Sequence, residues 1–209
     1  IDTYKPADMP MAYGANNHGS IVQIKDQWYI FYHRHTNGSW YSRQGCAEPI
    51  SIAEDGSIEQ VEITSCGLNG GPLAGQGEYP AYLACHLFTD EPSMYVGGDA
   101  FPKVMQDGKD GDEEIGYVGN VQNSATIGFK YFDMKNVKKI RVTMRGYISG
   151  NIEVRLTWDG DVLASLPIEF TNVWETYESE IEIPDGIHSL YFTFRGDGNG
   201  ALKSFELLV

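Results

Sequence analysis

The chain has 209 residues, of which 29 are acidic and 15 are Lys or Arg, and its formal net charge at pH 7 is −14. A surface of this charge repels polyphosphate, which argues against nucleic acid as a partner. No apolar run approaches the roughly 20 residues that a membrane-spanning helix needs, which argues against a membrane partner. The length allows one large or two small domains with a core that needs no disulfide or metal. No signal peptide is visible, and because the chain begins at Ile1 and not at Met, we expect a processed chain or a fragment.

Apolar and polar residues alternate at period two along most of the chain, which is typical of half-buried strands. In the first third, strands are predicted at 20–24, 28–33, 40–43, 50–53 and 58–64. Further on, Ile140, Val142 and Met144 alternate with Arg141, Thr143 and Arg145. Asn-Gly and Asp-Gly pairs separate such runs, as expected for hairpin turns. No stretch shows a sustained helical period, so the sequence predicts an all-β protein.

The three cysteines, Cys46, Cys66 and Cys85, are too sparse for a disulfide scaffold, and no CxxC motif indicates a zinc or redox site. At most one disulfide can form, and partly buried, reduced thiols are the expected state. Between residues 67 and 80, glycine-rich stretches interrupt the alternation. We therefore predict two domains, residues 1–75 and 76–209.

Three motifs in the first segment occur in order: the Asn-Asn-His-Gly-Ser turn at 16–20, the Trp-Tyr-Ile-Phe-Tyr-His strand at 28–33, and an Ser-Arg strand that begins at Ser42. Together they resemble the last propeller blade of glycoside hydrolase family 43. The resemblance implies a five-bladed β-propeller that removes arabinosyl or xylosyl groups with inversion. Inversion needs an acid and a base roughly 6.5–9.5 Å apart. In the family these carboxylates come from earlier blades, so no catalytic residue is expected in this chain, and Glu48 is interpreted as a strand-edge charge.

The same resemblance suggests residues that surround the sugar site. His18 would be the histidine near the propeller axis, binding a calcium or other cation or the water on it, since a neutral imidazole can ligate a cation. Arg34 and Arg43 would hold a carboxylate or a sugar hydroxyl through charge-assisted hydrogen bonds. Trp40, after a predicted turn, would line the substrate cleft. A hydrogen-bonded turn histidine and surface arginines are the simpler alternatives.

The second segment resembles carbohydrate-binding module family 6, a β-sandwich of the jelly-roll type. The resemblance lies in five motifs in the family order: 115–118 (IGYV), 131–134 (YFDM), 150–156 (GNIEVRL), 171–177 (TNVWETY) and 186–196 (GIHSLYFTFRG). Such modules bind xylan or related glucans between two aromatic rings and an asparagine. Aromatic planes suit the apolar C–H faces of sugars, and polar groups at the rim fix their orientation.

By this resemblance Trp174 falls on the cleft tryptophan, and Phe129 and Tyr177 are further candidates for carbohydrate contact. Two positions depart from the family: Thr126 falls near the cleft-aromatic position, and Ala201 stands where the binding asparagine is expected. Residues 82–86 replace the paired glutamates of the first strand, which puts the family's structural calcium in doubt. The sandwich is therefore expected either to bind polysaccharide or only to support the propeller.

Both resemblances together predict the C-terminal portion of an inverting arabinofuranosidase or β-xylosidase. Its partners would be xylan, arabinoxylan, arabinan or their oligosaccharides, together with the N-terminal propeller blades. The alternative is a stand-alone carbohydrate-binding protein without catalysis. The sequence assigns no compartment.

Overall fold

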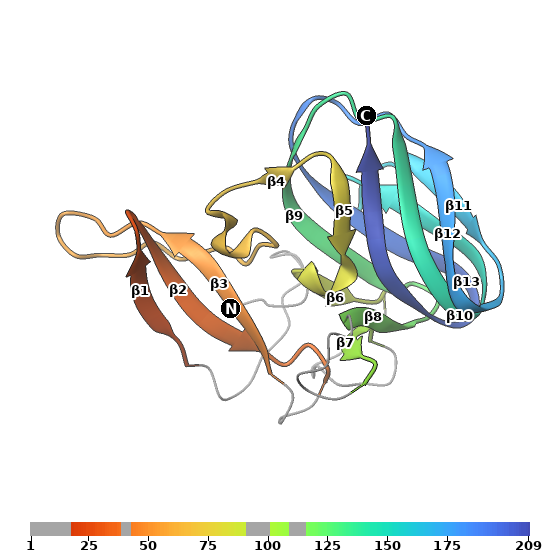
Figure 1. Cartoon of the computed structure of the whole chain (residues 1–209), viewed down its shortest axis with the longest axis horizontal. Coiled ribbons are helices and arrows are strands. Elements are labelled where there is room, and N and C mark those ends of the chain that lie inside the picture. Colours follow the sequence, from red (N-terminus) through yellow and green to blue (C-terminus); the bar gives the residue numbers. More distant parts are fainter. Residues whose placement is uncertain (1–17, 39–42, 91–100, 109–115) are drawn as a thin grey trace.

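A computed structural model describes residues 18–38, 43–90, 101–108 and 116–209 (Figure 1). Nearly all of the regular structure is strand. The two short exceptions are the 3-10 helices η1 (Gly67–Asn69) and η2 (Ala81–Leu83). The prediction of an all-β protein is confirmed.

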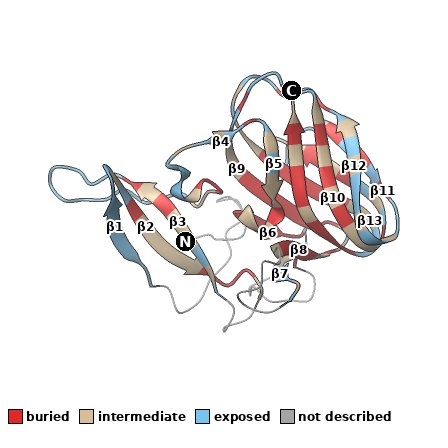
Figure 2. Ribbon diagram, viewed as in Figure 1, coloured by how far each residue is buried: buried red, intermediate tan, exposed pale blue. Residues whose placement is uncertain are grey.

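The first sheet is a small antiparallel one, made of β1 (Ser20–Ile24), β2 (Gln27–Arg34) and β3 (Gln44–Ile50) in that order. Strand β1 lies at its edge with every residue exposed, whereas β3 carries buried residues (Figure 2). Burial therefore increases from the outer strand toward the second sheet.

The first two strands occur where the sequence predicts them, but the later ones do not. Most of the strand predicted at 40–43 lies outside the described residues. In place of strands at 50–53 and 58–64, β3 ends at Ile50 and a single bridge joins Ile52 to Ile58. A tight turn explains this, because the Gly56 amide donates to the Ala53 carbonyl and the chain reverses after too few residues to extend the ladder.

The second sheet has ten strands and curls into a sandwich (Figure 1). Its strands are β4 (Leu73–Ala74), β5 (Gly77–Pro80), β6 (His86–Phe88), β7 (Lys103–Gln106), β8 (Gly116–Val121), β9 (Thr126–Met134), β10 (Lys139–Arg155), β11 (Ala164–Ile168), β12 (Thr171–Glu180) and β13 (Gly186–Leu208).

Strands β10 and β13 hold the sandwich together, because they pair with each other along almost their whole length, from Lys139↔Leu208 to Arg155↔Tyr191. The first half of β10 pairs with β12 on its other side, and its second half pairs with β11. Likewise, β13 pairs first with β9 and then with β8 and β5. The two strands thus pass through both layers.

Glycines stand opposite each other where the two long strands cross between layers. Gly146 pairs with Gly200 and has φ +139°, and a Cβ on it would lie 2.5 Å from the Gly200 Cα. Only glycine tolerates this approach together with a positive φ. Gly146 and Gly200 also line a surface cleft, so this crossing shapes its floor or wall.

The core lies between the two layers of the sandwich (Figure 2). Alternation places it: Ile140, Val142 and Met144 are fully buried, as predicted, while Arg141 on the opposite face makes ion pairs with Glu178 and Glu206.

The chain passes from the small sheet to the sandwich between residues 62 and 80. Strand β4 already pairs in parallel with β9, and β5 pairs with β13. The boundary predicted at 75/76 therefore falls inside this crossing segment, between its two short strands.

Candidate functional site

An aromatic cluster lies on the outer face of the sandwich, where Trp174 of β12 meets Tyr117 of β8 and Arg145 of β10. The two rings are edge to face with centroids 5.6 Å apart. The guanidinium carbon of Arg145 stands 4.2 Å from the Trp174 ring centroid and 5.2 Å from that of Tyr117. The Lys203 ammonium lies 5.9 Å from the Trp174 ring centroid, so two cations border the indole.

Asp107 holds Arg145 in this position, with Nη2 at 2.8 and 3.1 Å from the two carboxylate oxygens. Burial, with a further contribution from Asp107, raises the pKa of Tyr117 above its ordinary value. The cluster therefore contains a neutral phenol and a paired guanidinium, and its indole is fixed by contacts on two sides.

A cleft of about 530 Å³ opens beside this cluster. Its walls include Tyr117 and Arg145 and three asparagines, Asn120, Asn172 and Asn199. The Asn199 amide donates to the Asn120 side-chain oxygen at 3.0 Å, so two of these amides support each other. Aromatic surface beside a row of amides suits a neutral polyhydroxylated ligand.

The structure separates the three carbohydrate-contact residues predicted in the sandwich. Trp174 is partly exposed and contacts Tyr117 and Arg145, which line the cleft, but it does not line the cleft itself. Phe129 is 0% exposed and packs against Phe192 and Phe205 in the core, so the prediction for it is wrong. Tyr177 pairs with Val142 of the core-facing row and its hydroxyl donates to the Glu169 carbonyl, which places it away from the cleft lining.

Phe129 faces the core because of its position in the alternating pattern of its strand and because of the residue it pairs with. Phe129 is on β9, paired with Leu190, and both side chains face the interior. Tyr117, Arg145 and Asn199 were not predicted as site residues from the sequence. For Arg145 the sequence did contain a signal, because its alternation with the buried residues of β10 predicts that its side chain lies on the outer face.

Of the residues predicted around the propeller sugar site, Arg34 has a different role. It is 2% exposed, and its guanidinium donates to the Ala84 carbonyl at 2.9 Å and the Cys85 carbonyl at 2.7 Å. These carbonyls belong to the segment that begins the sandwich. Arg34 therefore joins the two sheets, and the prediction that it holds substrate is wrong for this arrangement.

Two of the other three predicted residues, His18 and Arg43, lie next to strands of the small sheet. His18 is exposed, with its ring edge to face against His33 at 4.7 Å, and His33 lies 5.5 Å from His35. Burial, followed by the charges of His33 and Arg43, lowers the pKa of His35. Arg43 is exposed. Trp40 lies outside the described residues.

Glu48 is the only buried acidic residue in the described part of the chain. Its carboxylate accepts hydrogen bonds from the Thr64 amide at 2.7 Å, the Thr64 hydroxyl at 2.6 Å and the Tyr32 hydroxyl at 3.1 Å. Burial raises its pKa despite these donors. A buried carboxylate bonded in this way fixes the 62–66 segment to the small sheet.

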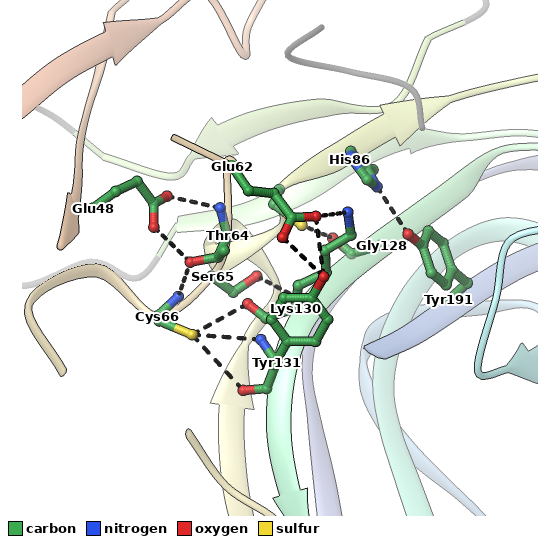
Figure 3. A network of polar contacts seen from close by, with 11 residues as sticks. Glu48, Glu62, Thr64, Ser65, Cys66, His86, Gly128, Lys130, Tyr131 and Tyr191 are labelled. Atoms are coloured by element: carbon green, nitrogen blue, oxygen red, sulfur yellow. Dashed lines mark hydrogen bonds and ion pairs between the residues drawn. The ribbon is translucent and has the colours of Figure 1, made fainter. Parts of the chain in front are cut away.

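The 62–66 segment is in turn bonded to β9 of the sandwich (Figure 3). Glu62 accepts from the Lys130 ammonium at 2.7 Å and from the Tyr131 hydroxyl at 2.9 Å, and the Ser65 amide donates to the Lys130 carbonyl. Cys66 Sγ lies 3.5 Å from the Tyr131 amide. Figure 3 shows these contacts converging on Lys130 and Tyr131 of β9, so Glu48, through Thr64, is connected to the sandwich.

The three cysteines are free thiols. Among residues 18–38, 43–90, 101–108 and 116–209, no group of three or more His, Cys, Asp or Glu side chains is placed to hold a metal ion. A cation at His18 would thus need donors from outside these residues. Within the same residues, no helix is long and apolar enough to cross a membrane.

Comparison with known proteins shows what the sandwich is similar to. The family model for the carbohydrate binding module (family 6) matches residues 104–207. A solved family 6 module from Clostridium cellulolyticum, in complex with xylose, aligns with 65% of this chain and 99% of its own, with TM-score 0.52 and 17% identity. Residues 104–207 therefore match the family 6 model in sequence, and the sandwich shares its fold with a solved family 6 module.

Longer relatives cover both sheets. A xylosidase/arabinosidase of Thermoclostridium stercorarium is 59% identical over 99% of this chain and 45% of its own length. An arabinoxylan arabinofuranohydrolase of Paenibacillus polymyxa is 26% identical over 92% of this chain and 31% of its own. The structure of a glycoside hydrolase family 43 arabinoxylan arabinofuranohydrolase from Bacillus subtilis shares the fold over 93% of this chain and 41% of its own, with TM-score 0.61 and 21% identity. The chain thus spans less than half the length of the relatives it matches.

Proposed function

We propose that this chain is the sugar-binding and supporting part of a glycosidase that removes arabinofuranosyl or xylosyl groups from arabinoxylan, arabinan or derived oligosaccharides. The observation that carries the proposal is the 59% identity, over nearly the whole chain, to a xylosidase/arabinosidase. In this proposal the acid and base that invert the anomeric centre, and the other propeller blades, belong to a longer protein. Glu48 is not placed in that pair, because its carboxylate is buried and bonded to Thr64.

In this arrangement the small sheet is the blade that completes the propeller, and the sandwich fixes its orientation. Arg34 and the Glu48–Thr64 pair connect the two parts through buried polar bonds. Buried, hydrogen-bonded groups of this kind are costly to break. Support of the blade by the sandwich therefore follows from the geometry of the junction. His18 and Arg43 remain proposed contacts on the propeller side, His18 to a cation or its water.

Sugar binding by the sandwich is the second part of the proposal, and the cleft beside Trp174 favours it. One face of the indole rests on Arg145, which lines the cleft together with Asn172 and Asn199. A pyranose would stack on the indole with its hydroxyls toward these amides. Ala201, which replaces the family's binding asparagine, also lines the cleft, so Asn199, two residues before it on β13, is the proposed substitute.

The reaction is tested with p-nitrophenyl α-L-arabinofuranoside and p-nitrophenyl β-D-xyloside, on the full-length gene product and on the 209-residue chain. We expect turnover by the full-length protein alone, with proton NMR showing release of the inverted anomer. Turnover by the 209-residue chain, or retention of configuration, would contradict the proposed placement of the carboxylates.

Binding is tested separately by isothermal titration of the 209-residue chain with xylohexaose. Trp174→Ala is expected to abolish the heat of binding, whereas Trp158→Phe, which keeps an aromatic ring beside Phe88, is expected to leave it unchanged. Equal affinity of the wild type and Trp174→Ala would remove the cleft from the proposal without affecting the proposed reaction.

A further inference from the structure

Two aromatic side chains outside the Trp174 cluster are unusually exposed. Tyr147 of β10 is 77% exposed, and Phe170, which precedes β12, is 56% exposed. Their ring centroids are 4.7 Å apart at an interplanar angle of 38°. Aromatic rings contribute most when they are buried, so two that remain in solvent and in contact with each other form a surface available for a ligand.

This pair continues the cleft. Tyr147 itself lines it, and so do Thr171 and Asn172, the residues that follow Phe170. Tyr147 also pairs across the sheet with Asn199, one of the cleft amides. A ligand lying in the cleft can therefore extend onto the Tyr147 ring without leaving the protein surface.

The backbone holds the two rings in place. Tyr147 is inside the β10–β13 ladder, next to the Gly146–Gly200 pair. After Phe170, the Thr171 hydroxyl donates to the Val173 carbonyl at 3.0 Å and accepts from the Val173 amide at 3.2 Å. A preformed surface loses less conformational entropy when a ligand binds.

We propose that Tyr147 and Phe170 form a second sugar platform, which lets the sandwich hold a longer stretch of a β-1,4-linked xylan chain than the Trp174 cleft holds alone. The inference rests on the proposed function, because it takes the cleft to bind sugar. The chemistry fits: pyranose rings offer apolar faces for the two aromatic rings, and hydroxyl edges for Asn172 and Asn199. A neutral chain also meets no repulsion from this acidic protein.

The test compares a short and a long ligand by isothermal titration with the 209-residue chain. Wild-type protein is expected to bind xylohexaose more tightly than xylobiose. Tyr147→Ala is expected to weaken the affinity for xylohexaose about tenfold, because one stacking contact is lost. The affinity for xylobiose is expected to change by less than about twofold. Tyr147→Phe keeps the ring and is expected to bind as the wild type does. Ile187→Ala is the matched control, because Ile187 is 60% exposed and pairs with β9 away from the cleft.

Several outcomes would overturn the platform. Equal affinity of the wild type for both ligands would leave the cleft as a sugar site but remove the platform. An equal loss for both ligands in Tyr147→Ala would show that the substitution disturbs the cleft. Loss of a dimer in sedimentation velocity, with sugar affinity unchanged, would assign the rings to contact with a second copy of the chain. Failure of wild-type protein to bind either ligand would overturn the platform and the proposed sugar binding together, while the proposed reaction is tested independently.

Discussion

Replacing Arg34 by alanine should weaken the attachment of the small sheet to the sandwich and lower the free energy of unfolding. The guanidinium is 2% exposed and donates to two carbonyls of the sandwich, at 2.9 and 2.7 Å. A hydrogen bond from a charged donor contributes about 1.5–3 kcal/mol, and the truncation leaves both acceptors buried, so we expect a loss of about 3–5 kcal/mol in the free energy of unfolding. Arg34→Lys should recover only part of this, since one ammonium cannot reproduce the fork of a guanidinium.

The loss is measured by urea unfolding of the 209-residue chain, with amide hydrogen exchange to locate it. Exchange in β2 and β3 should accelerate far more than exchange in β10 and β13, because the junction opens before the sandwich does. Arg43 is an exposed arginine that directly precedes β3, so Arg43→Ala serves as control and should change stability by less than about 0.5 kcal/mol. Equal effects of Arg34→Ala and Arg43→Ala would refute the assignment of Arg34 to the junction.

Three further predictions concern the sandwich. Burial, followed by the charges of Lys130 and Arg34, lowers the pKa of His86 to about 3. As the pH falls, His86 is therefore protonated in the unfolded state before it is protonated in the folded state. The free energy of unfolding should then fall by about 1.4 kcal/mol per pH unit between roughly pH 6 and pH 3. His86→Phe should flatten this slope in urea titrations, whereas Tyr191→Phe, which removes only the hydrogen bond to His86, should keep it; a slope unchanged in His86→Phe would assign it to other groups. Gly146→Ala should cost about 2 kcal/mol or more in chemical denaturation, because it combines a positive φ with a Cβ 2.5 Å from the facing Gly200 backbone, and a neutral effect would mean that the strands can separate. Phe129→Ala should lower stability by about 3–5 kcal/mol, and where the variant stays folded its xylohexaose affinity should match that of the wild type; a folded variant with weakened binding would return Phe129 to the sugar site.

Most of the fold could be predicted from the sequence, because alternation is a local signal. The run from Ile140 to Arg145 places alternate side chains inside and outside, and the structure agrees. The strands after Ile50 could not be placed correctly. Their apolar residues alternate as in a strand, but the turn at Gly56 allows only one bridge, between Ile52 and Ile58. The 62–66 segment bonds instead to β9, which lies more than 60 residues further along the chain.

The site was less predictable, because it depends on parity and on long-range contacts. Trp174 was identified by resemblance, and the structure places it beside the cleft. Phe129 was assigned to the same site, but its parity on β9 turns it inward. The role of Arg34 depends on carbonyls about 50 residues further along the chain, and no local pattern identifies such partners.

The most direct test of the account is to incubate the purified 209-residue chain with insoluble arabinoxylan, and to measure both the protein bound to the solid and the pentose released. The account predicts that protein is depleted from solution, that Trp174→Ala remains in solution, and that no pentose is released. Release of arabinose or xylose by this chain would place catalytic carboxylates within it, and failure of the chain to bind would leave the sandwich as a support alone.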